Sequence, residues 1–209
     1  VHIYCSDAKH GGSGHNCLLI TAHHIAIDGM SLDIVMRDVG RSYKQNNSLI
    51  QNHTSMYEFS CKQSQYLNST EGERLWNCWH RALSGHTPTI SLVTDYNRPP
   101  IQKTEGGIYN LSFKPHQVNA LKVFAKHENL TVYTVLLTVF ASMLHKYSGQ
   151  HDILIGSPML GRQLDGSVEV DECVGNFANP VVLRSIISPG TTFKKMLKQI
   201  FKRVMNALE

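Results

Sequence analysis

Two adjacent histidines, followed at a fixed distance by an aspartate and a glycine, are the residues of this sequence best suited to chemistry. The stretch reads His23-His24-Ile25-Ala26-Ile27-Asp28-Gly29. At average residue usage the pattern HHxxxDG arises by chance in roughly one chain of this length in a few thousand. An imidazole titrates near neutral pH and can take up or release a proton there. The pattern therefore indicates a site for proton transfer or for positioning a reacting group.

The residues around this pattern predict the elements that must position it. The apolar run Leu18-Leu19-Ile20-Thr21-Ala22 predicts a buried strand. Residues 1–8 and 16–22 together predict two strands joined by a loop rich in Gly and His over residues 10–15. Apolar residues at helical spacing then predict a helix to about Asn46, with Ser31 as its N-cap. We therefore expect the histidines at the end of a strand, and Asp28-Gly29 in the turn into a helix.

The rest of the chain predicts an alternation of helices and strands. Helices are expected over 55–67 and 71–83, from Pro115, from Thr131 to about Tyr147, and after Thr192. Strands are expected over 108–114 and 153–156. Since proline cannot donate to a ladder, a strand near Pro180 must begin there or lie at an edge. The polar, Pro- and Gly-rich stretch 95–107 is the best candidate for a boundary.

The composition excludes several classes of protein. A chain of 209 residues with 42% apolar and 17% charged residues can bury a sizeable core. No apolar run approaches the length of a membrane span, and no signal segment is recognisable. The net charge of +4 is spread along the chain without a Lys/Arg block. We therefore expect neither a nucleic-acid partner nor a membrane, and we expect a cytoplasmic protein.

The cysteines and histidines do not form a metal-binding pattern. Five cysteines, an odd number without any CxxC spacing, predict reduced and mostly buried thiols in a cytosolic protein. His10, His15, His23 and His24 lie near Cys5 and Cys17 in the sequence, but none forms a zinc-knuckle pair. We therefore expect no metal.

The HHxxxDG pattern resembles the active-site signature of the condensation domains of non-ribosomal peptide synthetases, which are relatives of chloramphenicol acetyltransferase. Similar strings occur in epimerization domains, lipoyl-enzyme acyltransferases and wax-ester synthases. Other segments of the chain are therefore needed to distinguish condensation domains from these related families. Four segments resemble those of condensation domains, and they follow one another in the family's order. They are Tyr57-Glu58-Phe59-Ser60 with Gln63 and Gln65 (YxDFAxWQ, with Met56 for the aromatic and Glu58 for the aspartate), Asp95-Tyr96-Asn97-Arg98-Pro99-Pro100 (DRPRP), Ser157 to Arg162 (GTPVAGR), and Val174 to Arg184 (VGxFVNTLPLR, with Pro180 for threonine).

The resemblance implies an α/β fold, the chloramphenicol acetyltransferase-like two-lobe sandwich with mixed sheets and flanking helices. The family's earlier motifs (SxAQxRLW, RHExLRT) and later motifs (HQDxPFE, RDxSRNP) are missing, so we expect a central fragment that is truncated at both ends and inactive in isolation. Residues 1–95 would be the C-terminal part of the first lobe. Residues 96–107 would be the inter-lobe linker, and residues 108–209 the N-terminal part of the second lobe.

The resemblance also implies a reaction. A condensation domain joins a donor acyl or peptidyl thioester to an aminoacyl thioester acceptor. Both are carried on the phosphopantetheine of carrier proteins, so no cofactor is bound directly. The implied partners are the upstream and downstream peptidyl carrier proteins and an adjacent adenylation domain. The alternatives are an ester-forming or epimerizing relative of the same fold, or a non-catalytic carrier-protein-binding fragment.

By the same resemblance the candidate catalytic residues are His24, His23 and Asp28. The imidazole of His24 would face the attacking amine. It would act as a general base, or it would hold the amine near the carbonyl, since α-amines with a pKa of about 7.7–8.0 are already partly uncharged at neutral pH. His23 is expected to be structural, because neighbouring side chains on a strand point in opposite directions.

In the family that the chain resembles, the equivalent carboxylate pairs with an arginine, so the resemblance implies that Asp28 does the same and holds the histidine loop. Arg162 is the candidate partner, with a solvent-facing arginine as the alternative. Gly29 would provide backbone freedom in the turn. Asn179 would face the substrate tunnel or form hydrogen bonds at a strand edge. Gly29, Arg162 and Asn179 are thus the candidate supporting residues.

Overall fold

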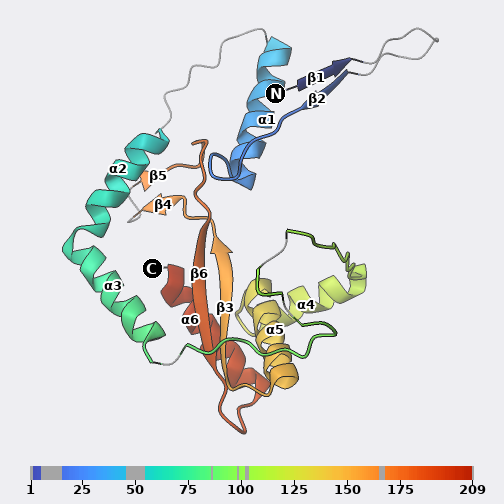
Figure 1. Cartoon of the computed structure of the whole chain (residues 1–209), viewed down its shortest axis with the longest axis vertical. Coiled ribbons are helices and arrows are strands. Elements are labelled where there is room, and N and C mark those ends of the chain that lie inside the picture. The colour runs from blue at the N-terminus through green and yellow to red at the C-terminus, as the bar shows by residue number, and fades with distance from the viewer. Residues whose placement is uncertain are drawn as a thin grey trace. The chain divides into compact units, whose positions relative to one another are not determined.

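The structure is a computed structural model that describes residues 2–5, 16–45, 55–85, 87–97, 99–101, 104–164 and 168–208 (Figure 1). Three two-stranded sheets and six helices occur in this part of the chain. Their bounds are β1 (His2–Cys5), β2 (Asn16–Leu19), α1 (Gly29–Gln45), α2 (Met56–Leu67), α3 (Thr70–Leu83), α4 (Pro115–His127), α5 (Val132–Ser148), β3 (Asp152–Met159), β4 (Gln163–Leu164), β5 (Val168–Glu169), β6 (Asn179–Ile186) and α6 (Phe193–Leu208).

The described residues form two compact units. Unit 1 contains the residues up to Leu75 together with Met159–Asn179, and unit 2 contains Trp76–Pro158 together with the residues from Pro180 onward. The segment 159–179 is therefore far from the HHxxxDG stretch in sequence but belongs to the same unit. The expected division into lobes at residues 96–107 stays a prediction.

Unit 1 begins with the predicted pair of strands, which is confirmed in part. Strands β1 and β2 are antiparallel, with His2 opposite Leu19 and Cys5 opposite Asn16. The prediction that the second strand continues to Ala22 is wrong, because β1 provides no described partner beyond the pair His2–Leu19. The histidines therefore lie beyond the strand, and the expected alternation of side chains does not apply to them. The predicted loop 10–15 lies outside the described residues.

Helix α2 gives a structural role to one residue that departs from the family pattern. The Ser55 hydroxyl accepts a hydrogen bond from the Glu58 amide (3.1 Å), and the Ser55 amide donates to Glu58 Oε2 (2.8 Å). This reciprocal capping box begins the helix, as Ser-x-x-Glu predicts. Glu58, which replaces the aspartate of YxDFAxWQ, is thus a capping residue. Phe59 of α2 packs edge-on against Phe177, with ring centroids 5.0 Å apart.

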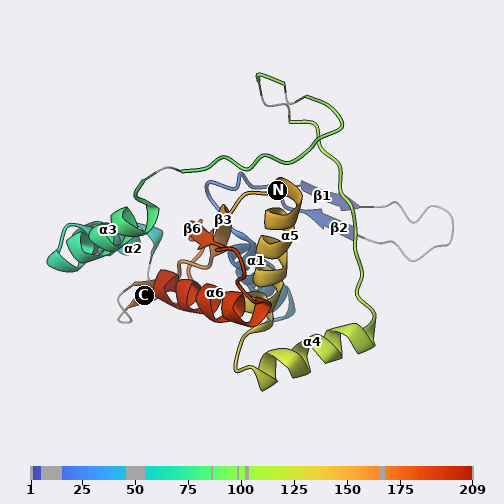
Figure 2. The same cartoon turned by 90° about the horizontal axis from the view of Figure 1, so that it is seen from below.

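Unit 2 is built from the β3–β6 sheet and the helices α4, α5 and α6. The start of α5 is capped by Thr131, whose hydroxyl accepts from the Thr134 amide (3.1 Å), and Gly149 ends the helix with a φ of 69°. Pro115 occupies the first turn of α4, as predicted. Helices α5 and α6 lie side by side in both views (Figures 1 and 2). Their contact and the sheet bury one shared cluster, made of Leu144, Ile153, Ile187 and Met196.

Two strand predictions have opposite outcomes. Strand β6 begins at Asn179, so Pro180 lies at a strand start, and this prediction is confirmed. The predicted strand 108–114 is wrong. Ile108 and Tyr109 are 92% and 90% exposed, and no described strand pairs with this segment. An alternating pattern forms a strand only where a partner satisfies its backbone groups.

Candidate functional site

The two histidines lie in a tight turn between β2 and α1. The amide of Ala26 donates to the His23 carbonyl (2.9 Å), and residues 24–26 form the turn. The amide of Ile25 donates to Nδ1 of His23 (3.1 Å). A ring nitrogen that accepts cannot carry a proton, so this hydrogen bond requires the tautomer with the proton on Nε2. His23 thus stabilises the turn through its hydrogen bond with the Ile25 amide. The alternation of side chains along a strand, on which the prediction for His23 is based, is not the cause.

His24 presents its ring to solvent. Its side chain is exposed and makes no hydrogen bond to any residue that the structure describes. A ring in this position can accept a hydrogen bond from an incoming group, or donate one to it, without first breaking a hydrogen bond within the protein. The catalytic role of His24 stays a prediction.

Asp28 and Arg162 form the ion pair that the resemblance implies. Arg162 Nη2 lies 2.8 Å from Asp28 Oδ1, and the two residues are only 3% and 8% exposed. The second carboxylate oxygen, Oδ2, accepts from the Phe177 amide (3.0 Å). The solvent-facing alternative for Arg162 is therefore excluded.

The guanidinium of Arg162 connects three segments of unit 1. Nη1 donates to the carbonyls of Val170 (2.9 Å) and Cys173 (2.8 Å), while Nη2 donates to Asp28 and to the hydroxyl of Ser31 (2.8 Å). The guanidinium carbon also lies 4.4 Å from the centroid of the Phe177 ring, in cation–π contact. Nε is buried and has no partner among the described residues. The guanidinium group is planar and carries several N–H donors in fixed directions, which suits it to these contacts. The single ammonium group of a lysine could not make them all.

Ser31 is the site residue that the sequence failed to assign. Its side chain is fully buried, and its hydroxyl donates to the Gly175 carbonyl (2.7 Å) while accepting from the Gly175 amide (3.0 Å) and from Arg162. One donor and two acceptors are all that a hydroxyl offers. We call Asp28, Ser31 and Arg162, with the backbone of Gly175 and Phe177, the Asp28–Arg162 anchor.

The prediction that Ser31 caps α1 is wrong. Asp28 is the cap, because its Oδ1 accepts from the Ser31 amide (2.8 Å) and its carbonyl accepts from the Leu32 amide (3.1 Å). The Asp28 amide in turn donates to the Gly175 carbonyl (3.1 Å). The anchor thus fixes both the end of the histidine turn and the start of α1.

The hydrogen bonds of the anchor control the charge of Asp28. Burial alone raises the pKa of this carboxyl, but the donors from Ser31, Phe177 and Arg162 outweigh burial and lower the pKa to about 2. Asp28 is therefore an anion at any pH near neutrality, and with so low a pKa its carboxylate is too weak a base to take up a proton there.

This pKa predicts how the stability of the chain depends on pH. A carboxyl with a pKa of 3.8 unfolded and about 2 folded contributes roughly 2 kcal/mol. The contribution is fully present above about pH 4 and is lost as the pH falls through 2. The free energy of unfolding should therefore fall by about 2 kcal/mol more in the wild type than in Asp28→Asn between pH 5 and pH 2. Equal losses in both proteins would contradict this assignment.

Gly161, the residue before Arg162, is required by its conformation and by its surroundings. Its φ is +60°, and a Cβ there would lie 2.1 Å from the Phe177 carbonyl oxygen. Gly161→Ala should therefore lower the free energy of unfolding by at least about 3 kcal/mol, through backbone strain and a steric clash together. Gly190 is the matched control, because its φ is +75° and nothing lies within 4 Å of its Cβ position. Gly190→Ala should lower it by only about 1 kcal/mol, and equal losses on chemical denaturation would refute the role of the clash.

The remaining supporting residues do not join the anchor. The prediction that Gly29 provides backbone freedom in the turn is wrong. Its φ lies outside the left-handed region, and nothing lies within 4 Å of the position that a Cβ would occupy. It is the first residue of α1, where other residues are also tolerated. Asn179 is exposed at the start of β6, and its side chain makes no hydrogen bond to the described part of the chain. Its supporting role stays a prediction.

Three further predictions concern metal binding, membrane spans and the cysteines. Within the ranges given above, no group of three or more His, Cys, Asp or Glu residues could hold a metal ion. Among those residues, no single helix has the length and apolarity to cross a bilayer; only α4 and α5 together, bent by 102°, meet these criteria of length and composition. Of the four cysteines whose side chains the structure describes, Cys17 and Cys78 are exposed and only Cys173 is buried, so the prediction of mostly buried thiols is wrong.

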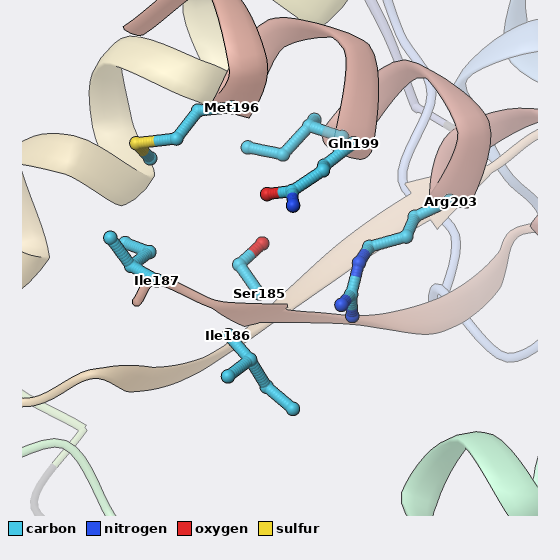
Figure 3. Close-up of a pocket in the computed structure, with 7 residues that line it drawn as sticks. Ser185, Ile186, Ile187, Met196, Gln199 and Arg203 are labelled. Atoms are coloured by element: carbon cyan, nitrogen blue, oxygen red, sulfur yellow. The ribbon is translucent and has the colours of Figure 1, made fainter. Parts of the chain in front are cut away.

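One pocket lies within unit 2, between β6 and α6 (Figure 3). Its volume is about 10 Å³, which is room for about one water molecule. Burial lowers the pKa of Arg203 in its wall, and the neighbouring Asp152 partly opposes this. The pocket is too small for an acyl chain. Its lining residues are Ser185, Ile186, Ile187, Met196, Gln199, Ile200 and Arg203.

Comparison with known proteins gives a consistent result. The family model described as "Condensation domain" matches residues 9–209. Gramicidin S synthase 2 of Brevibacillus brevis is 31% identical over 197 residues, which are 94% of this chain and 4% of that protein. The chain therefore spans a small part of the curated relatives that it matches.

Two solved structures show the same fold. The first condensation domain of the CDA synthetase has a TM-score of 0.72 at 20% identity, over 89% of this chain and 41% of that one. The epimerization domain from the third module of tyrocidine synthetase B has a TM-score of 0.75 at 18% identity, over 88% of this chain and 42% of that one. The predicted α/β fold, related to chloramphenicol acetyltransferase, is confirmed.

Proposed function

The chain belongs to the condensation-domain family, and we propose that the polypeptide containing it forms peptide bonds in non-ribosomal peptide synthesis. The proposed substrates are a donor acyl or peptidyl thioester and an aminoacyl thioester acceptor. The observation that carries the proposal is the exposed imidazole of His24, in a turn that ends at the buried Asp28–Arg162 anchor. The segments that form the anchor are the ones that match the family.

In the proposed reaction, the acceptor's α-amine attacks the donor's carbonyl carbon. A C–N bond forms, the C–S bond breaks, and the thiol of the donor arm leaves. We propose that His24 holds the amine within bonding distance and removes a proton from the nitrogen once the tetrahedral intermediate has formed. The imidazolium can then return this proton to the leaving thiolate, so that the ring ends neutral. Positioning contributes because it replaces a bimolecular encounter with a fixed geometry.

Asp28 has a different part in the proposal. Its carboxylate accepts hydrogen bonds from Ser31, Phe177 and Arg162, and its pKa of about 2 leaves it without a proton to exchange. We therefore propose that Asp28 is a positioning residue, which holds the turn that carries His24. His23 supports the same turn through its bond with the Ile25 amide.

The proposed partners follow from the same family. They are the upstream and downstream peptidyl carrier proteins, whose phosphopantetheine arms carry the substrates, and an adjacent adenylation domain. The small share of gramicidin S synthase 2 that matches this chain supports a multidomain setting for that relative. A cytoplasmic location belongs to the same proposal.

Two alternatives share the fold. An ester-forming or epimerizing relative would use the same histidine on another substrate, and the likeness to an epimerization domain shows that the fold does not separate these activities. The segment Val174 to Arg184 resembles the condensation branch and favours amide formation. The second alternative is a non-catalytic module that binds carrier proteins.

Product analysis tests the proposal. The full-length polypeptide that carries residues 1–209 is mixed with a donor-loaded carrier protein and with an acceptor carrier bearing either an α-amine or the matching α-hydroxyl. We expect the mass of the amide product on the acceptor carrier, and none when the amine is acetylated. Product from the hydroxyl acceptor alone, or a donor changed only in stereochemistry, would overturn amide formation. Carrier binding without any product would support the non-catalytic module.

A further inference from the structure

Two histidine rings outside the candidate site lie against each other in unit 2. His145 is in the last turn of α5, and His151 immediately precedes β3. Their ring centroids are 4.9 Å apart, and the ring planes are inclined by 46°. His151 is exposed and His145 is half-buried, so solvent can reach the pair.

The hydrogen bonds of the pair fix the tautomer of each ring. Nδ1 of His145 lies 2.7 Å from the Gln150 carbonyl, and Nδ1 of His151 lies 2.9 Å from the Ile187 carbonyl. A carbonyl oxygen can only accept, so each Nδ1 must carry the proton. In the neutral rings both Nε2 atoms therefore have a free lone pair, and neither forms a hydrogen bond with the part of the chain described here.

Each ring makes the kind of hydrogen bond that metal-binding histidines make through their second nitrogen. A histidine that binds a metal through one nitrogen nearly always donates its other ring N–H to a carboxylate or a backbone carbonyl, which fixes the ring and increases its basicity. Imidazole suits Zn²⁺, Cu²⁺ and Ni²⁺. We propose that His145 and His151 form a two-imidazole site for a divalent transition-metal ion, bound through the two Nε2 atoms.

The surroundings define what kind of site this is. The nearest carboxylate in sequence, Asp152, is engaged by Arg184, whose Nη2 lies 2.7 Å from its Oδ2. No third His, Cys, Asp or Glu in the described ranges completes a protein cage. Water fills the other positions, so the site is an exchangeable one rather than a closed structural one. A bound ion would link the end of α5 to the start of β3 and so stabilise unit 2.

Titration with Ni²⁺ alone tests this proposal. We expect His145→Asn and His151→Asn each to weaken Ni²⁺ binding at least tenfold by calorimetry, and the double variant to bind no more weakly than either single one. Asparagine retains an N–H donor near the position of Nδ1 and removes Nε2, so the carbonyl contacts can persist. The control is His116→Asn, at an exposed position in α4, which should bind as the wild type does. Single variants that bind within twofold of the wild type would overturn the proposal.

A second measurement needs no substitution. Ni²⁺ is paramagnetic, so substoichiometric Ni²⁺ should broaden the ring resonances of His145 and His151 in the wild-type chain before those of other histidines. Ni²⁺ should also raise the melting temperature of the wild type but not that of the Asn variants. Broadening that begins at other histidines would overturn the proposal even if a variant failed to fold.

Discussion

Replacing Arg162 with methionine is expected to lower the free energy of unfolding by about 3–5 kcal/mol. The side chain is 3% exposed, and its guanidinium supplies four hydrogen bonds, two within the anchor and two to the carbonyls of Val170 and Cys173. Methionine fills a similar volume but leaves the Asp28 carboxylate buried without its cation. An unpaired buried charge is among the few single changes that destabilise a protein this strongly. Urea denaturation of the wild-type and variant chains measures the difference.

Two further variants make this test specific. Arg37 pairs with Glu172 on the exposed surface of the same unit, so Arg37→Met should change the free energy of unfolding by less than about 1 kcal/mol. Adding Asp28→Asn to Arg162→Met removes the second charge, and the double variant should lose less than the two single losses added together. An Arg162→Met protein within about 1 kcal/mol of the wild type would contradict the anchor.

Replacing His24 with alanine is expected to reduce the rate of peptide-bond formation by about 10²–10⁴-fold. The imidazole is exposed and makes no hydrogen bond with the described residues, so the fold loses nothing when it is removed. Its loss removes both the positioning of the amine and the acceptor for its proton. The measurement is the single-turnover rate of product formation by the full-length polypeptide, with both carriers loaded.

The controls for His24 separate chemistry from folding. The melting temperature of His24→Ala should match that of the wild type. His23→Ala should instead lower stability by about 1 kcal/mol, because the Ile25 amide loses its acceptor. A near-normal rate in His24→Ala, with intact carrier loading, would remove His24 from the reaction.

Local signals predicted the helices well. Thr131 before α5, Pro115 in α4 and the Ser55–Glu58 capping box each act within one turn of the helix that they begin, so their residue types alone are informative. The strand over 108–114 failed for the opposite reason. A strand depends on a partner elsewhere in the chain, and alternation along one segment does not show whether that partner exists.

The candidate site could be predicted only in part. The pairing of Asp28 with Arg162 spans 134 residues, and it came from the resemblance to a family rather than from spacing. Ser31 shows how a local rule can mislead. A serine near the start of a helix usually caps it, but here the buried contacts with Gly175 and Arg162 occupy its hydroxyl, and Asp28 caps the helix instead. Such competition between local and distant partners is not visible in one sequence.

The central claim is that the Asp28–Arg162 anchor holds the turn that carries His24. Amide hydrogen exchange tests it most directly, because the Asp28 amide donates to the Gly175 carbonyl within the anchor, while the Phe59 amide lies in α2 of the same unit. We predict that Arg162→Met lowers the protection of the Asp28 amide, relative to that of Phe59, at least tenfold. An unchanged ratio would mean that the turn is held independently of the ion pair, and it would contradict the account.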